Sequence, residues 1–168
     1  MNELWHVSED PTIEVFHPHH HELHALDEPL VWAVDSHHMW LYWFPRDCPR
    51  ACFNAKDDTT DEDVERWLDG DRDRRVAVIE TGWLEPMRGT SVYAYRMPVE
   101  TFVPWDKFFV SRETVVPIVV VELGDLFARH ADTGNEVRIA PTLYPLWDKV
   151  IETTLDFSGI RLRNAVRP

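Results

Sequence analysis

The strongest constraint on the fold is a series of short runs of β-branched and aromatic residues, separated by proline, glycine and polar residues. Each run has the length and composition of one β-strand. The last run, residues 115–123, is nearly all apolar, which predicts a strand at the centre of a sheet. We predict strands at residues 4–7, 30–34, 51–54, 75–80, 91–97, 108–110 and 115–123.

Helix signals lie between these runs and near both ends of the chain. The signals are aspartate or threonine at an N-cap, proline at the first helical position, and apolar residues at helical spacing. We predict one turn between Asp10 and Phe16, a helix over residues 37–44 capped by Asp35, a helix within residues 57–73 that follows Thr60, a short helix from Gly124, and an amphipathic helix over residues 141–157.

The order of these elements indicates the fold class. A strand-rich middle with helices near both ends is typical of an α+β fold rather than a doubly wound sheet. The chain has no repeat, low-complexity tract or linker, so residues 1–168 are predicted to form a single domain.

Composition limits the partners. The hydrophobic fraction of 44% excludes a disordered or fibrous chain. Lys and Arg number 17 against 30 Asp and Glu, which gives a formal net charge of −13 at pH 7. Such a chain repels duplex DNA and anionic membranes at long range, so we expect neither nucleic acid nor a membrane as partner.

Cysteine use and the absence of sorting signals bear on the compartment. Cys48 and Cys52 are too few and too close to form a disulfide framework, which indicates a reducing compartment. The start of the sequence lacks the pattern of a signal peptide, and no apolar run is long enough to cross a bilayer. We therefore expect a bacterial, cytoplasmic protein.

A histidine-rich stretch within residues 17–28 raises the question of metal binding, since neutral imidazole is a good ligand for zinc. Adjacent histidines point in different directions, and neither an HExxH nor a CxxC pattern accompanies them. We expect a solvated loop and assign no metal ligand. Cys48 or Cys52 as ligand or nucleophile is not supported, because Cys52 falls in an apolar strand and Cys48 follows Asp47. The histidines of the stretch are His17, His19, His20, His21 and His24, and His37 and His38 lie nearby in the sequence.

Three guanidinium groups lie in predicted turns beside strands, where phosphates and other anions are commonly bound. They are Arg46, Arg50 and Arg112. Exposed ion pairs with the abundant carboxylates are the alternative use.

A further pattern joins residues far apart in the chain: His6 on the first strand, Trp32 on the second, and Glu113 before a late strand. Each has an ordinary structural explanation. A strand histidine is usually a core residue whose ring is hydrogen-bonded, and a tryptophan usually packs against other apolar side chains. Taken together, the three residues indicate a site.

Three segments carry a resemblance to a known family. Leu4–Ser8 opens the chain, residues 30–44 form an aromatic strand followed by a helix, and Phe109–Thr114 precedes an apolar strand. Their order resembles that of the ADP-ribosyltransferase superfamily, in particular the small rifamycin-modifying ADP-ribosyltransferases. The resemblance implies a mostly antiparallel, twisted or split sheet with flanking helices. The segments His6–Phe16 and Pro45–Arg50 also look like those of an uncharacterised bacterial domain family with no assigned activity.

The resemblance implies that NAD is bound and loses nicotinamide through an oxocarbenium-like transition state. His6, with Ser8 beside it in the motif, would hydrogen-bond the ribose of NAD. Trp32 would stack on the nicotinamide in place of the family's usual tyrosine. Arg46 or Arg112 would neutralise the pyrophosphate, where bidentate contacts are strongest.

Two carboxylates compete for the catalytic role, which is to stabilise the developing ribosyl cation. Asp106 and Glu113 both lie near the matching segment, and the residues leave the choice open. Val7 replaces the family's glycine after the histidine, which disfavours close approach of a ligand to that backbone. The alternatives to an active enzyme are a non-catalytic relative that binds another ligand or a protein, and a metal-binding protein built on the histidine-rich loop.

Overall fold

The fold is known from a computed structural model, which describes residues 3–20 and 28–167. It confirms an α+β fold with mostly antiparallel sheets. The chain divides into two compact units, each built from two separate stretches. The first unit comprises residues up to Trp43 together with Ser91–Gly124, and the second comprises Phe44–Thr90 together with the chain from Asp125 onward. That residues 1–168 form one domain stays a prediction.

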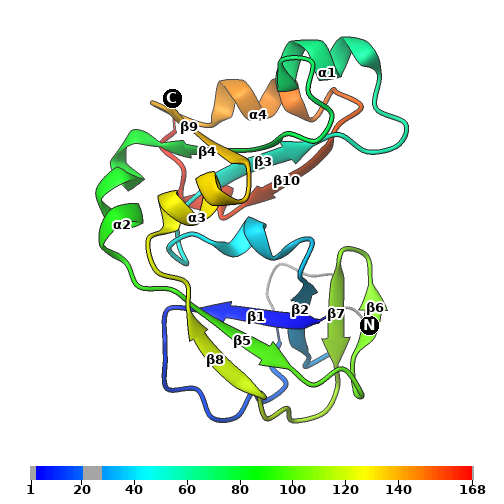
Figure 1. Cartoon of the computed structure of the whole chain (residues 1–168), viewed down its shortest axis with the longest axis vertical. Coiled ribbons are helices and arrows are strands. Elements are labelled where there is room, and N and C mark those ends of the chain that lie inside the picture. Colours follow the sequence, from blue (N-terminus) through cyan, green and yellow to red (C-terminus); the bar gives the residue numbers. More distant parts are fainter. Residues whose placement is uncertain (1–2, 21–27, 168) are drawn as a thin grey trace. The chain divides into compact units, whose positions relative to one another are not determined.

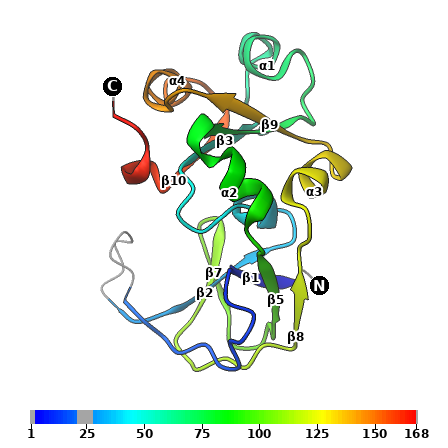
Figure 2. The ribbon, with the colours of Figure 1, turned by 90° about the vertical axis from the view of Figure 1, so that its left-hand side faces the viewer.

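The first unit contains a six-stranded sheet in which every pair of neighbours is antiparallel (Figures 1 and 2). The strand order is β6-β7-β2-β1-β5-β8. The strands are β1 (Leu4–Ser8), β2 (Val31–Asp35), β5 (Tyr93–Met97), β6 (Val103–Trp105), β7 (Phe108–Ser111) and β8 (Val119–Glu122).

One face of this sheet carries a hydrophobic core. Leu4 is paired with Met97 and lies on the same face as Tyr95, because side chains alternate along a strand. The buried members of the cluster are Leu4, Val31, Ala33, Tyr95, Met97, Phe102 and Val115. Ile13 and Phe16 pack against it, so the segment after β1 folds back over this face.

Tyr95 fixes that segment with its hydroxyl group. The hydroxyl donates to the Asp10 carbonyl at 2.5 Å and accepts from the Ile13 N–H at 3.2 Å. The predicted helical turn before Phe16 is wrong. The Asp10 carboxylate accepts from both the N–H and the hydroxyl of Thr12, which closes a local turn, and Phe16 pairs with Val115 as an isolated bridge.

Replacing Tyr95 with phenylalanine should lower the free energy of unfolding by about 1–2 kcal/mol, because two hydrogen bonds are lost at a buried position. Urea denaturation followed by tryptophan fluorescence measures the change. Tyr93→Phe, two residues earlier on the same strand, is the matched control and should be nearly neutral. Equal losses in the two variants would contradict this role for the Tyr95 hydroxyl.

The second unit contains a four-stranded sheet of order β10-β3-β4-β9. The strands are β3 (Arg50–Asn54), β4 (Arg75–Glu80), β9 (Asn135–Ala140) and β10 (Asp156–Ile160). The β4–β9 pair is parallel and the other two pairs are antiparallel.

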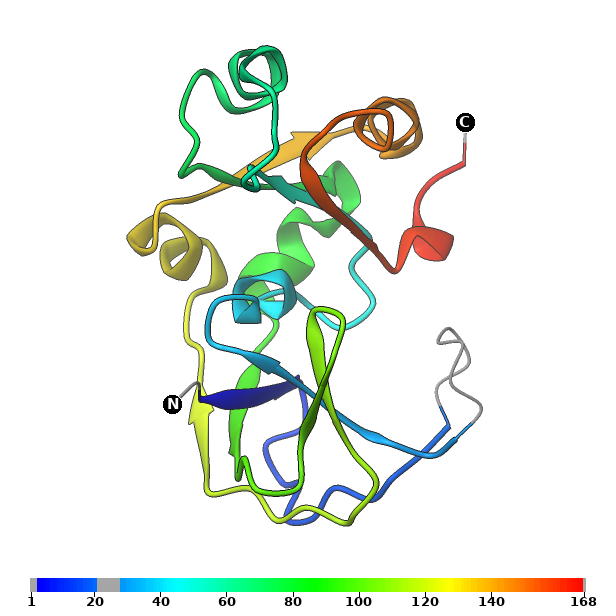
Figure 3. The same cartoon turned by 90° about the vertical axis from the view of Figure 1, so that its right-hand side faces the viewer.

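Helices lie on both faces of this second sheet (Figures 1 and 3). α1 (Asp61–Leu68) and α4 (Tyr144–Val150) cover one face, and Val64, Leu68 and Val150 pack there with Phe53 and other buried strand residues. α2 (Leu84–Gly89) and α3 (Leu126–Asp132) lie on the other face. Short 3-10 turns complete the chain: η1 (Met39–Tyr42), η2 (Thr81–Trp83) and η3 (Leu162–Asn164).

Two of the predicted helices begin at side-chain N-caps. The Thr60 hydroxyl accepts from the Asp63 N–H at 3.3 Å, and three acidic residues follow in the favourable first turn of α1. The Asp125 carboxylate accepts from the Ala128 N–H at 2.9 Å at the start of α3. Among the described residues, no helix has both the length and the apolar character needed to cross a membrane.

Several predicted elements differ from the structure. The apolar run at 115–123 is not central: β8 is an edge strand with its side chains exposed. The helix predicted over 37–44 is the 3-10 turn η1, and the helix predicted over 141–157 ends at Val150, so that Phe157 lies on β10 instead. The sequence analysis did not predict β6, β9, β10 or α2.

Candidate functional site

His6 lies on β1, and its imidazole contacts the backbone of the neighbouring strand. The His6 Nδ1 atom is 2.8 Å from the Trp32 carbonyl oxygen. A carbonyl oxygen can only accept a hydrogen bond, so Nδ1 carries the proton. The regular pairing of β1 with β2 ends at Trp5 and Val34, and the imidazole therefore binds a carbonyl beyond the end of that ladder. The His6 ring also packs on Phe16, with ring centroids 4.7 Å apart.

Trp32 lies on β2 within a group of three rings, which we call the aromatic cluster: Trp32, Trp105 and Phe108. Trp32 meets Trp105 edge to face at a centroid distance of 5.2 Å, and meets Phe108 in the same way at 5.6 Å. Trp105 and Phe108 are closer to parallel, at 6.4 Å and 30°. All three side chains are half-buried, so the rings pack against one another and each keeps part of its surface exposed.

The side chains of His6 and Trp32 project from opposite faces of the sheet. Trp5 is paired with Val34, and Trp32 is two residues from Val34, so Trp32 shares the face of Trp5 and not that of His6. The ring contacts agree, because His6 meets Phe16 whereas Trp32 meets Trp105. His6 contacts Trp32 through the Trp32 carbonyl, and the two side chains do not line a common cleft.

Asp106 is the predicted acid that lies close to Trp32 in the fold. It occupies the turn of the β6–β7 hairpin, between the two rings that contact Trp32. Its φ of 51° is in the left-handed region, which aspartate and asparagine tolerate better than most residues. Its side chain is exposed.

Glu113 and Arg112 follow the other end of β7. Arg112 donates to Glu28 through Nε at 2.8 Å and through Nη2 at 2.7 Å, a bidentate ion pair. These hydrogen bonds hold the pKa of the Glu28 carboxyl below its ordinary value. Glu113 is exposed, and its backbone N–H donates to the Ser111 hydroxyl. Ser8, at the end of β1, accepts from the Asp10 N–H.

The second unit holds the other predicted arginines. Arg46 is exposed in the turn before β3. Arg50 is buried: its guanidinium donates to the Cys48 carbonyl at 2.8 Å and lies 5.0 Å from the centre of the Phe44 ring. Phe44 in turn packs on the fully buried His130. Arg50 is therefore a buried residue of β3 whose guanidinium makes structural contacts.

The histidine-rich stretch, considered above for metal binding, lies partly within the described residues. Within residues 3–20 and 28–167, no group of three or more His, Cys, Asp or Glu side chains is arranged to hold an ion. His21 and His24 lie outside the described residues.

Sequence reasoning missed two features of the first unit. Trp105 and Phe108 were not predicted to join Trp32, although their two-residue spacing around a turn is a hairpin signal. The Asp35 carboxylate accepts from His38 Nδ1 at 2.8 Å and from the His38 N–H at 2.9 Å. Asp35 was predicted as an N-cap, whereas the N-cap of η1 is His38. The Asp35 carboxylate instead binds His38, a histidine that had been considered only as a metal ligand.

Comparison with known proteins gives a family. Residues 5–165 match DUF6886, a family of unknown function, and the chain belongs to this family. No match was found among curated proteins or among solved structures.

Proposed function

We propose that the first unit binds NAD on the aromatic cluster and that the chain transfers ADP-ribose to an acceptor. The observation that carries this proposal is the placement of Asp106 in the turn between Trp105 and Phe108, the two rings that contact Trp32. The nicotinamide ring of NAD is cationic and aromatic. Indole faces and a nearby carboxylate are the groups that attract such a ring.

The transfer is a substitution at C1′ of the nicotinamide-bearing ribose. The bond from C1′ to the nicotinamide nitrogen breaks, nicotinamide leaves with the electron pair, and positive charge develops on the ribose. An oxygen or nitrogen of the acceptor then bonds to C1′ and loses its proton. Asp106 is the carboxylate we assign to stabilise the ribosyl cation, and Glu113 is the second choice because it lies beyond the far end of β7.

His6 takes a different role from the one implied by the resemblance. Because its Nδ1 donates to the Trp32 carbonyl, we assign it as a positioning residue that holds β2 where Trp32 joins the cluster. The pyrophosphate is the part of NAD that fits least well. Arg112 is already neutralised by Glu28, and Arg46 belongs to the second unit.

A second candidate is a protein that binds a nucleotide or another aromatic ligand on the same cluster without catalysis. The specific observation in its favour is that His6 and Trp32 project from opposite faces of the sheet. A fold can keep a binding surface after its catalytic arrangement is lost.

The test combines calorimetric titration with NAD and an assay for released nicotinamide. Asp106→Asn keeps the size of the side chain and suits the left-handed turn. We expect it to reduce nicotinamide release by about a hundredfold, the usual effect of losing one electrostatic stabiliser, and to lower NAD affinity by a much smaller factor, because the carboxylate also attracts the bound cationic ring. Asp58→Asn, an exposed position in the second unit, is the matched control and should leave both unchanged.

Absence of NAD binding at millimolar concentration would overturn the proposal. Binding by the wild-type chain without release of nicotinamide above the buffer rate would favour the second candidate. Equal release by wild type and Asp106→Asn would remove Asp106 from the catalytic role.

A further inference from the structure

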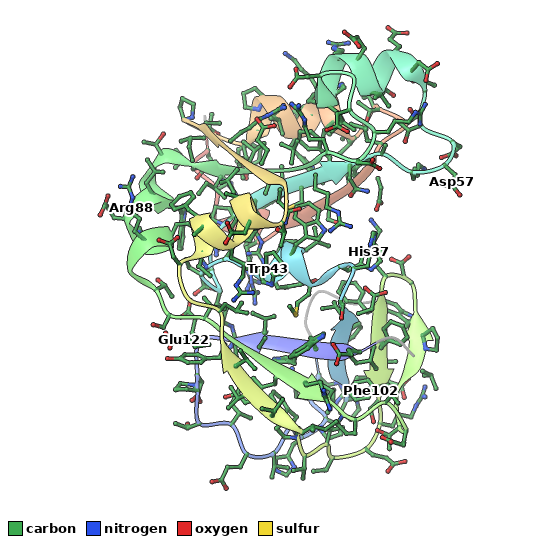
Figure 4. All side chains as sticks on the ribbon, in the orientation of Figure 1. His37, Trp43, Asp57, Arg88, Phe102 and Glu122 are labelled. Carbon is green, nitrogen blue, oxygen red and sulfur yellow. The ribbon has the colours of Figure 1, made fainter. Side chains whose placement is uncertain are left out.

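The edge strand β8 is the exposed apolar feature that the proposed function does not use. Val119, Val120 and Val121 are 45%, 41% and 45% exposed, and Val116 and Ile118 just before them are 63% and 55% exposed. β8 lies outside β5 at the end of the six-stranded sheet and ends at Glu122 (Figures 2 and 4). Both sides of one strand are therefore apolar and solvent-exposed.

The outer backbone groups of β8 are open. Leu123 N–H donates to the Val92 carbonyl, and the register pairs Val121 with Ala94. In an antiparallel ladder the inward and outward backbone groups alternate, so the N–H and C=O of Val120 and Glu122 point away from β5. No hydrogen bond from these outward groups is found within the described part of the chain.

The other sheet edges carry features that discourage pairing with another chain. β6 contains Pro104, β9 carries Glu136 and Arg138, and β10 contains Gly159. β8 has neither a charged residue nor a proline between Ile118 and Glu122. An edge of this composition is a template for strand pairing.

We propose that β8 pairs with β8 of a second copy of this chain, joining two six-stranded sheets across a twofold axis. Pairing of an edge with its own copy is necessarily antiparallel, and this strand is self-complementary in that arrangement. When the open groups of Val120 bond those of Glu122 in the other copy, Val121 lies opposite Val121 on one face and Val120 lies opposite Glu122 on the other. Each copy supplies the open N–H and C=O of Val120 and Glu122 to the other.

The size and charge of the contact determine its strength. One short strand per copy makes an interface smaller than the standard area of about 1,600 Å², so we expect a dissociation constant in the micromolar range or weaker. Each copy carries a formal charge of −13. Since salt screens the repulsion between the copies, with a Debye length falling from about 10 Å at 0.1 M to about 3 Å at 1 M, the dimer should strengthen as salt is added.

Sedimentation equilibrium over a range of concentrations tests the proposal on the full chain. Val120→Asp places a carboxylate opposite Glu122 of the other copy, and Val120→Pro removes an outward N–H without removing a bond to β5. Both should weaken dimerisation at least about tenfold while the far-ultraviolet circular dichroism stays unchanged. Val103→Asp, on β6 at the opposite edge of the same sheet, is the matched control and should dimerise like wild type.

Three results would overturn the proposal: a wild-type chain that is monomeric at every concentration, a dimer that persists in both Val120 variants, or a dimer that weakens with added salt. NAD binding is measured separately, so failure of the dimer leaves the proposed function untouched.

Discussion

Replacing Glu80 with alanine is expected to lower the free energy of unfolding by about 3 kcal/mol, the usual cost of removing one partner from a buried, charge-assisted set of hydrogen bonds. Glu80 ends β4 and is 2% exposed. Its carboxylate accepts from the Leu143 N–H at 3.1 Å and from the Val166 N–H at 3.0 Å. Alanine would leave the Leu143 N–H buried without an acceptor.

Urea denaturation followed by tryptophan fluorescence measures this loss. Glu80→Gln keeps one carbonyl oxygen in place and should cost less than alanine. Glu85→Ala removes a side chain that is 82% exposed and paired with Arg88, so it should change stability by less than about 0.5 kcal/mol. A loss at Glu80 no larger than that at Glu85 would mean that the segments around Leu143 and Val166 are held by other contacts.

Cys48 is expected to react with a thiol reagent about a thousandfold more slowly in the folded chain than an exposed cysteine does at pH 8. Burial raises the pKa of the Cys48 thiol to about 12, and the nearby Glu80 carboxylate adds to the shift while Arg50 opposes it. The thiolate is the reactive form, so its fraction falls by about three orders of magnitude relative to a pKa of 9.0. The Cys52→Ala variant isolates Cys48 for labelling with a chromogenic disulfide.

The same pKa shift predicts how stability depends on pH. The folded state keeps the Cys48 proton up to about pH 12, whereas the unfolded thiol loses it near pH 9.0. The folded state therefore binds more protons between these values, and stability falls as the pH rises through that window. Rapid labelling of the Cys52→Ala variant at pH 8 without denaturant would show that the thiol is accessible and that the shift does not govern its reactivity.

Local signals predicted the elements that depend on neighbouring residues. The Thr60 cap of α1 and the Asp125 cap of α3 depend on side chains three residues from the N–H groups they bind. β4 occupies residues 75–80 as predicted, because its apolar run is bounded by turn residues on both sides. The α+β class followed from the order of these elements.

Position within a sheet could not be predicted from the same signals. Val119–Val121 reads as a buried central strand, because an apolar run looks the same whether a core or a second chain covers it. β9 was missed because Glu136 and Arg138 interrupt its apolar pattern, and both lie at an edge where charge is tolerated.

The candidate site was predicted only in part for a similar reason. His6 and Trp32 were predicted on the first and second strands of the chain, but the pairing of these strands and the face on which each side chain projects depend on a register that no local pattern reveals. The contact of Trp32 with Trp105 and Phe108 requires the β6–β7 hairpin to lie beside β2, which is a long-range pairing. Of the two acids, this hairpin brings Asp106 to Trp32.

The discontinuous make-up of the two units governs the order in which the chain can fold during synthesis. β1 pairs with β5 and β4 pairs with β9, so the first sheet cannot close before residues 93–97 are synthesised and the second cannot close before residues 135–140 are. Long-range pairings of this kind slow folding. A fragment that preserves either unit has to include both of the stretches that form it.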